Sequence, residues 1–303
     1  SNAVTPATVT APSFVQQAST HAASASSISV IPSSPLGSGN RLVVEVGAWS
    51  ASNATTSSVT DSAGDTFAEV SHFTGPDQTE QSVWTAPITA GTGSAPTVTA
   101  KFSSAAAGAM TALEYRGLSA AAGSGAVDGQ ASAAGTTTAA ASVSSGPTAA
   151  TSGSNELSVG FYSDSGFGDT LTAGSGYTSR TNISNTGDME LLAEDQVVVA
   201  GATPAASAGT GARTAWEMAT VVFKAGSQAP PTVPAAPASA AATAGDQSAV
   251  VTWSAPANGG SPITSYTVTP YIGSAAQTAT VVTGSPPATS ATVKGLTDGT
   301  GYT

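Results

Sequence analysis

The chain has 303 residues, of which 8% are charged and 6% aromatic, and its formal net charge is −11 with seven Lys and Arg residues. So few cations cannot neutralise a phosphate backbone or hold an acidic membrane surface, which argues against nucleic acid as a partner and against membrane insertion. The absence of cysteine excludes disulfides and thiolate metal sites.

From residue 4 to residue 225, short alternating apolar segments are separated by clusters of Gly, Ser and Asn. Strict alternation is typical of half-buried strands, and segment 41–49 is the clearest case. Segment 58–67 is interpreted as a hairpin, because Asp61, Gly64 and Asp65 supply turn residues between two strands. Further strands are expected at residues 13–18, 27–31, 81–86, 96–102, 109–115, 156–162, 189–200 and 215–224.

Many short strands with few helical patterns predict an all-β fold, in which residues 4–225 form one large antiparallel, jelly-roll-like β-sandwich. The alternative is two smaller sandwiches divided within the low-complexity stretch 129–154. One domain is preferred, because no Pro-rich spacer marks that stretch.

The parity of each strand separates a core face from an open face. In segment 156–162, Leu157, Val159 and Phe161 share one face, which leaves Tyr162 on the other. The same reasoning places four more side chains outside the core: Trp49, Glu45, Glu114 and Trp216.

Aromatic rings on an open sheet face can stack on sugar rings, and loops on rigid scaffolds often carry binding residues. The alternative is that these rings pack under a loop or a second layer. The ligand-binding candidates are three such rings and an acid in the Gly-rich loop after residue 162: Trp49, Tyr162, Asp164 and Trp216.

Glu45 and Glu114 are candidates for the two carboxylates that a glycoside hydrolase needs as acid and base. The clustered Glu-x-Asp-x-x-Glu strand motif of jelly-roll glycanases is absent, and a solvated face explains both residues more simply. The only histidines, His21 and His72, are far apart in the sequence and are interpreted as solvated or loop residues. The sequence therefore favours a non-catalytic protein.

Calcium is the one cofactor for which the sequence offers ligands. Carboxylate oxygens in loops suit this hard cation, but turn formation explains the aspartates equally well, and no segment matches the EF-hand loop. The first candidate pair, Asp61 and Asp65, lies on one turn. The second pair, Asp188 and Glu190, belongs to an acidic cluster that also contains Glu194 and Asp195.

The run from residue 226 to residue 244 is rich in Pro and Ala and is interpreted as a semi-rigid spacer. After it come Ala-Val-Val-Thr-Trp at 249–253, Ile-Thr-Ser-Tyr-Thr-Val at 263–268, and Tyr302 six residues after Leu296. Together these features resemble the fibronectin type III domain, over roughly residues 231–303. The resemblance implies a sandwich of seven strands with Trp253 and Tyr266 in its core, and with Tyr302 at a tyrosine corner.

The chain stops at Thr303, where the resemblance places the start of the sixth strand, so the domain at residues 245–303 is expected to be incomplete. The region before the spacer is loosely similar to Ala/Thr-rich β-sandwich modules of exported bacterial proteins, on segments 59–66 and 114–117. No site residue is carried over from this likeness.

These observations favour a secreted or cell-surface, non-catalytic protein whose large sandwich binds a polysaccharide or another surface component and is carried on fibronectin-type spacers. The alternatives are a polysaccharide-degrading glycosidase or lyase, and a structural or adhesive surface protein without a small ligand.

Overall fold

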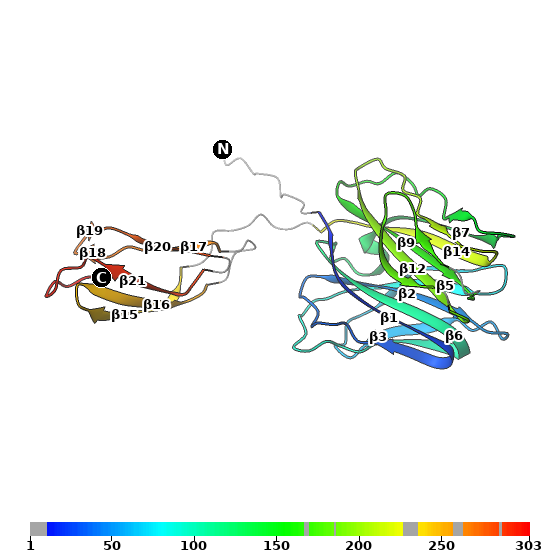
Figure 1. Cartoon of the computed structure of the whole chain (residues 1–303), viewed down its shortest axis with the longest axis horizontal. Coiled ribbons are helices and arrows are strands. Elements are labelled where there is room, and N and C mark those ends of the chain that lie inside the picture. The colour runs from blue at the N-terminus through cyan, green and yellow to red at the C-terminus, as the bar shows by residue number, and fades with distance from the viewer. Residues whose placement is uncertain (1–10, 167–169, 185, 227–235, 257–262, 285–286) are drawn as a thin grey trace. The chain divides into compact units, whose positions relative to one another are not determined.

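The computed structural model describes residues 11–166, 170–184, 186–226, 236–256, 263–284 and 287–303. The chain divides into a first compact unit, which ends at residue 228, and a second, which begins at residue 229 (Figure 1). In the described residues every strand pairing is antiparallel, and the one helix is the short 3-10 turn η1 (Gly123–Ala126). The predicted all-β, sandwich-like fold is confirmed. No helix within these ranges is long and apolar enough to cross a bilayer.

The first unit contains a six-stranded sheet, here called the β2 sheet, with the order β1-β6-β2-β5-β4 and with β3 paired to β6. β6 is long enough to pair with β2 through its second half and with β3 through its first half. The strands are β1 (Ser13–Val30), β2 (Arg41–Trp49), β3 (Thr56–Asp61), β4 (Ala68–Thr74), β5 (Glu80–Pro87) and β6 (Val98–Arg116).

A five-stranded sheet, the β9 sheet, has the order β11-β12-β9-β14-β7, and a small three-stranded sheet, the β13 sheet, has the order β10-β13-β8. The β9 sheet comprises β7 (Val127–Thr136), β9 (Glu156–Asp164), β11 (Thr178–Ile183), β12 (Glu190–Val198) and β14 (Ala215–Phe223). The β13 sheet comprises β8 (Ser142–Ser144), β10 (Thr172–Ala173) and β13 (Ser207–Gly209).

Both large sheets are covered on both faces. Between them lies a core that joins Val43 and Leu113 of the β2 sheet to Phe161 and Val221 of the β9 sheet. On the far side of the β9 sheet, the apolar side chains of β9 and β12 pack with those of the β13 sheet. The central strands β2 and β9 are therefore buried along almost their whole length.

The far side of the β2 sheet is covered by its own long strands. The first half of β6, the end of β1 and β3 contribute to one core with the alternate residues of β2. Phe102 packs on Gly108 of the same strand, so closely that a Cβ at position 108 would lie 2.5 Å from the ring. Residues six apart on one strand touch only if the strand is strongly bent, so β6 curls over the outer face.

Some strand predictions need correction. The predicted strands 13–18 and 27–31 are parts of one strand, β1, and 96–102 and 109–115 are parts of β6. Segment 58–67 is not a hairpin, because β3 pairs with β6 and β4 pairs with β5. The stretch 129–154, interpreted as low-complexity, contains most of β7, an edge strand of the β9 sheet whose small side chains alternate weakly.

In its described residues the second unit has one three-stranded and two two-stranded sheets. Trp253 and Tyr266 meet edge to face with ring centroids 5.2 Å apart, and the hydroxyl of Tyr302 accepts the backbone N–H of Thr297. The spacer predicted to reach residue 244 ends earlier, because its Pro-free end is a strand. The strands are β15 (Ala238–Gly245), β16 (Ser248–Ser254), β17 (Ser265–Val268), β18 (Tyr271–Ile272), β19 (Ala275–Ala276), β20 (Thr280–Thr283) and β21 (Ser290–Lys294).

Candidate functional site

The two glutamates predicted as a catalytic pair lie on opposite faces of the β2 sheet. Glu114 pairs with Leu42, whereas Glu45 pairs with Thr111, so their side chains differ in parity and point in opposite directions. Both are buried, at 1% and 0% exposure, although an open, solvated face was predicted. That prediction is wrong because a second layer covers each face of β2.

Glu114 is a structural anchor. Its Oε1 accepts the backbone N–H of Gly37 at 2.8 Å and the amide of Asn40 at 2.6 Å, while its Oε2 accepts the amide of Gln16 at 2.7 Å. These donors tie the connection between β1 and β2 to β6. The carboxylate has as many hydrogen-bond donors as a buried anion needs.

We expect Glu114→Gln to lower the free energy of unfolding of the first unit by about 1–3 kcal/mol, because an amide N–H₂ would face a donor and leave it unsatisfied. Chemical denaturation measures the change. Unchanged stability would mean that these contacts are exchanged for water at no cost.

Glu45 belongs to a buried polar network between the two sheets. The amide of Gln81 donates to Glu45 Oε1 at 3.3 Å and to Ser163 Oγ at 3.0 Å, and Ser163 donates to Glu217 Oε2 at 3.2 Å. Burial raises the pKa of Glu45 well above its ordinary value. Burial also raises the pKa of Glu217, assisted by the charges of Asp77 and Asp164 and opposed by the hydrogen bond from Ser163. These carboxyl groups favour their protonated forms.

Two ligand-binding candidates are enclosed. Tyr162, predicted on an open face, is fully buried against the β13 sheet, and its hydroxyl donates to Asp164 Oδ2 at 2.7 Å. Asp164 is also fully buried and accepts the hydroxyl of Thr214 and the backbone N–H of Gly166. Enclosed groups of this kind position the strand ends and present no surface to a ligand. Residues 167–169 of the loop lie outside the described ranges.

The two tryptophan candidates differ. Trp216 is half-buried and its indole ring packs on Gly135 of β7, where a Cβ would lie 3.0 Å from the ring. Trp49 remains 38% exposed at the end of β2, and its Nε1–H donates to the backbone carbonyl of Asp77 at 3.1 Å. Asp77 accepts both the backbone N–H and the hydroxyl of Thr79, so the turn that holds the indole is itself fixed.

The calcium candidates do not form one cluster. Asp61 Oδ1 accepts the backbone N–H groups of Ala63, Gly64 and Asp65, and burial followed by the charge of Asp61 raises the pKa of Asp65. Elsewhere Asp188 pairs with Nδ1 of His21 at 3.0 Å, and Glu190 is buried with its Oε1 accepting the backbone N–H of Thr186. Two carboxylates fall short of the six to eight oxygens that Ca²⁺ takes, so calcium binding stays a prediction.

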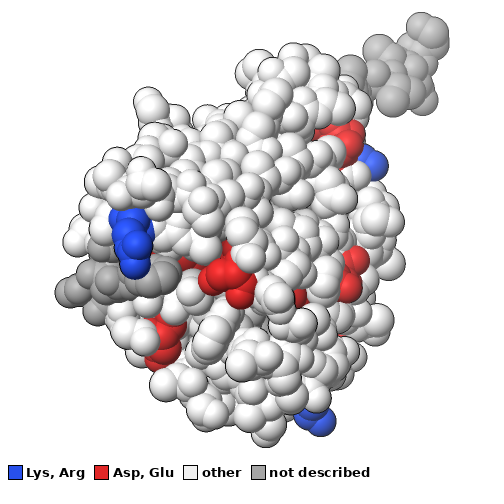
Figure 2. Space-filling view, turned by 90° about the vertical axis from the view of Figure 1, so that its right-hand side faces the viewer, with Lys and Arg blue, Asp and Glu red and all other residues white. Residues whose placement is uncertain are grey.

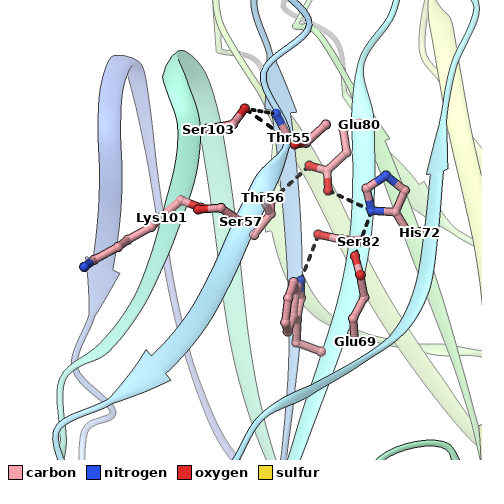
Figure 3. A network of polar contacts seen from close by, with 10 residues as sticks. Thr55, Thr56, Ser57, Glu69, His72, Glu80, Ser82, Lys101 and Ser103 are labelled. Atoms are coloured by element: carbon pink, nitrogen blue, oxygen red, sulfur yellow. Dashed lines mark hydrogen bonds and ion pairs between the residues drawn. The ribbon is translucent and has the colours of Figure 1, made fainter.

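The structure also brings together a group of polar side chains that sequence reasoning did not predict. Glu69 and His72 of β4 meet Glu80 of β5, with Nδ1 of His72 2.7 Å from Glu69 Oε1 and 3.5 Å from Glu80 Oε1 (Figure 3). Burial raises the pKa of Glu80, opposed by the neighbouring hydroxyl groups of Ser82 and Thr56 and by the charge of His72. A hairpin prediction at the Gly-Pro-Asp-Gln turn, residues 75–78, would have brought these residues together.

The surface of the first unit is weakly charged. Figure 2 shows a face covered mostly by uncharged residues, with scattered acidic groups and few basic ones. Several acidic side chains are instead buried, among them Glu45, Glu114, Glu194 and Glu217.

Residues 235–303 match the sequence model of the Fibronectin type III domain, which confirms the predicted resemblance of the C-terminal region. The curated proteins include no match to this chain. The fibronectin type III match is compatible with a non-catalytic module and assigns no ligand.

Proposed function

We propose that the first unit is a non-catalytic carbohydrate-binding module of an exported protein, and that the fibronectin-type unit is a spacer that carries it. The observation that supports this proposal is Trp49. Its ring is 38% exposed, yet its N–H is bound to the hydrogen-bonded turn at residues 75–79. A ring ordered in advance loses little conformational entropy when it stacks on a sugar.

Hydroxyl groups next to Trp49 suit the same ligand. Ser50 follows it directly, and its Oγ lies 3.2 Å from that of Ser52, which in turn lies 3.1 Å from that of Ser104. These hydroxyls are both donors and acceptors, as are those of a sugar. An apolar ring beside a row of hydroxyls matches a sugar, which has an apolar face and polar edges.

The two residues predicted to be catalytic in the enzyme alternative cannot act together on one substrate. A glycosidase places two carboxyl groups across one scissile bond, with both reaching the substrate. Glu45 and Glu114 point to opposite sides of a sheet and are both buried. The structural or adhesive alternative, in which no small ligand binds, is an outcome of the experiment below.

We expect Trp49→Ala to reduce retention on the glycan bound by the wild-type protein at least about tenfold, because the stacking surface is removed. Trp49→Phe keeps a ring and should retain more binding than Trp49→Ala. A glycan array followed by pull-down on the insoluble polysaccharide measures both.

Val199→Ala is the control, since Val199 is a 70% exposed apolar side chain in a different loop. Its retention should equal that of the wild type. Equal retention by Trp49→Ala would contradict the role of Trp49. The absence of retention by the wild type on every glycan would favour the structural or adhesive alternative.

A further inference from the structure

We propose that Glu69, His72 and Glu80 form a binding site for a divalent first-row transition metal ion, best represented by Zn²⁺. Each residue offers one ligand atom, and the three atoms all lie within 4.8 Å of one another. In the residues that the structure describes, no other such group of three occurs. The three ligands do not include Trp49, and the metal proposal does not rest on the proposed carbohydrate binding.

A β-bulge brings the ligands to one side of the hairpin. Residues three apart on a regular strand point to opposite faces, so Glu69 and His72 would diverge. The register shifts between Glu69, which pairs with Trp84, and Ser71, which pairs with Val83. The extra residue turns Glu69 to the face of His72 and Glu80. Bulges commonly re-aim a side chain in this way beside functional sites.

The buried carboxylate Glu80 points to a missing ligand. The residue is only 1% exposed, and its Oε2 accepts the hydroxyl of Thr56 at 3.0 Å. Its Oε1 has no hydrogen-bond donor among the described residues and lies 3.5 Å from Nδ1 of His72. A buried carboxylate oxygen without a donor is costly, and a bound cation would satisfy it. Figure 3 shows the side chain directed at the imidazole ring.

The spacing suits a small metal ion. Bonds of about 2.0–2.2 Å in a tetrahedral shell place ligand atoms roughly 3.3–3.5 Å apart. The distance from Glu80 Oε1 to Nδ1 of His72 already has this value, at 3.5 Å. Glu69 Oε1 lies closer, at 2.7 Å, and its side chain is 35% exposed and free to withdraw. Solvent would complete the shell.

The ligand set also selects the kind of metal. An imidazole with two carboxylates suits Zn²⁺ and its neighbours, whereas Ca²⁺ and Mg²⁺ prefer oxygen ligands alone. β4 is the outer strand of the β2 sheet, so a metal would fasten this edge to β5 and, through Thr56, to β3. The competing account is a protonated His72 that forms ion pairs with both carboxylates and binds no metal.

Isothermal titration of the EDTA-treated, dialysed full chain with ZnCl₂ separates these accounts. We expect one equivalent of zinc to bind, His72→Asn to abolish binding, and Glu80→Gln to weaken it at least about tenfold. Zinc should also raise the unfolding temperature of the wild-type first unit, because it binds only the folded state. CaCl₂ should produce neither effect at this site.

The chain supplies a matched control, because its only other histidine, His21, also contacts a carboxylate. His21→Asn should bind zinc as the wild type does. Exposed His72 tolerates substitution, and circular dichroism checks the fold of each variant. The proposal is overturned if the wild type takes up no zinc at millimolar concentration, or if His72→Asn binds it with wild-type affinity.

Discussion

Replacing Glu45 or Glu217 with glutamine is expected to stabilise the first unit at pH 8 by about 1–3 kcal/mol each, and to leave its stability nearly unchanged at pH 4.5. Both residues are fully buried between the two large sheets. Each also has a carboxyl oxygen without a hydrogen-bond donor among the described residues, Glu45 Oε2 and Glu217 Oε1. A neutral amide removes the cost of charging these groups.

The sign follows from the pKa values. A carboxyl group whose pKa is higher in the folded state than in the unfolded state takes up a proton on folding. Below about pH 4.3, the pKa of a glutamate in the unfolded chain, the carboxyl group is protonated in both the folded and the unfolded state, and no stability is lost. As the pH rises above that value the unfolded state ionises first, so stability falls until the folded pKa is passed. Burial raises the pKa of both Glu45 and Glu217 well above the ordinary value.

Two further buried glutamates also make the folded state less stable as the pH rises. Burial raises the pKa of Glu194 to about 7, against hydrogen bonds from two backbone N–H groups. Burial and the neighbouring carboxyl group of Asp128 raise the pKa of Glu156 to about 7. The wild-type first unit is therefore expected to lose stability between about pH 4.5 and pH 7.

Glutamine fits at position 45 because an acceptor is available. Gln81 Oε1 has no donor among the described residues, and it belongs to the amide that already contacts Glu45. Two amides facing each other can exchange two hydrogen bonds at every pH, whereas Glu45 can donate to Gln81 only while it is protonated. Guanidinium unfolding read by pulsed hydrogen exchange in β2 and β14 reports the first unit alone. Glu114→Gln is the control and should change stability in the opposite direction at pH 8.

The positions of most strands could be predicted, because alternation is a local property. The faces of these strands could not. Glu114 and Tyr162 alternate with apolar residues, which predicts an open face, but β6 and the connection between β1 and β2 cover the outer face of the β2 sheet, and the β13 sheet covers the outer face of the β9 sheet. These covering layers are built from Ser-, Thr- and Ala-rich segments whose local sequence carries little sign of burial. Parity identifies two faces and does not tell how many of them are covered.

The candidate metal site could not be predicted from the sequence for a related reason. His72 is isolated among the residues near it in the chain, and its partners depend on a bulge and on the register of the hairpin. In the second unit the outcome was different, since the resemblance placed Trp253 and Tyr266 together, and the two rings do meet edge to face. There the resemblance to a family supplied the register that parity alone lacks.

Arg41→Met is expected to lower the free energy of unfolding of the first unit by about 3–5 kcal/mol. Arg41 is 1% exposed, at the start of β2. Its Nε donates to the carbonyl of Ser119 at 3.0 Å, and its Nη2 to the same carbonyl and to that of Ala121. Its Nη1 donates to the hydroxyl of Thr85 at 2.9 Å. Burial lowers the pKa of Arg41 to about 10, so the guanidinium stays charged at neutral pH.

The carbonyls that Arg41 holds belong to the connection that leaves β6 and enters the β9 sheet. On its other side this connection is bound to the end of β14, where the N–H of Ser119 donates to the carbonyl of Lys224. Arg41 thus joins the two sheets at their crossover, and methionine would fill the space but leave buried carbonyls without a donor.

Arg41→Lys keeps the charge but lacks the several N–H donors of the guanidinium, so it should lower the free energy of unfolding by less than Arg41→Met does. Arg116→Met is the control, because Arg116 is exposed and donates to Ser13 at the surface, where its loss should cost less than about 1 kcal/mol. Denaturation midpoints that coincide for Arg41→Met and Arg116→Met would show that the crossover does not depend on this cation.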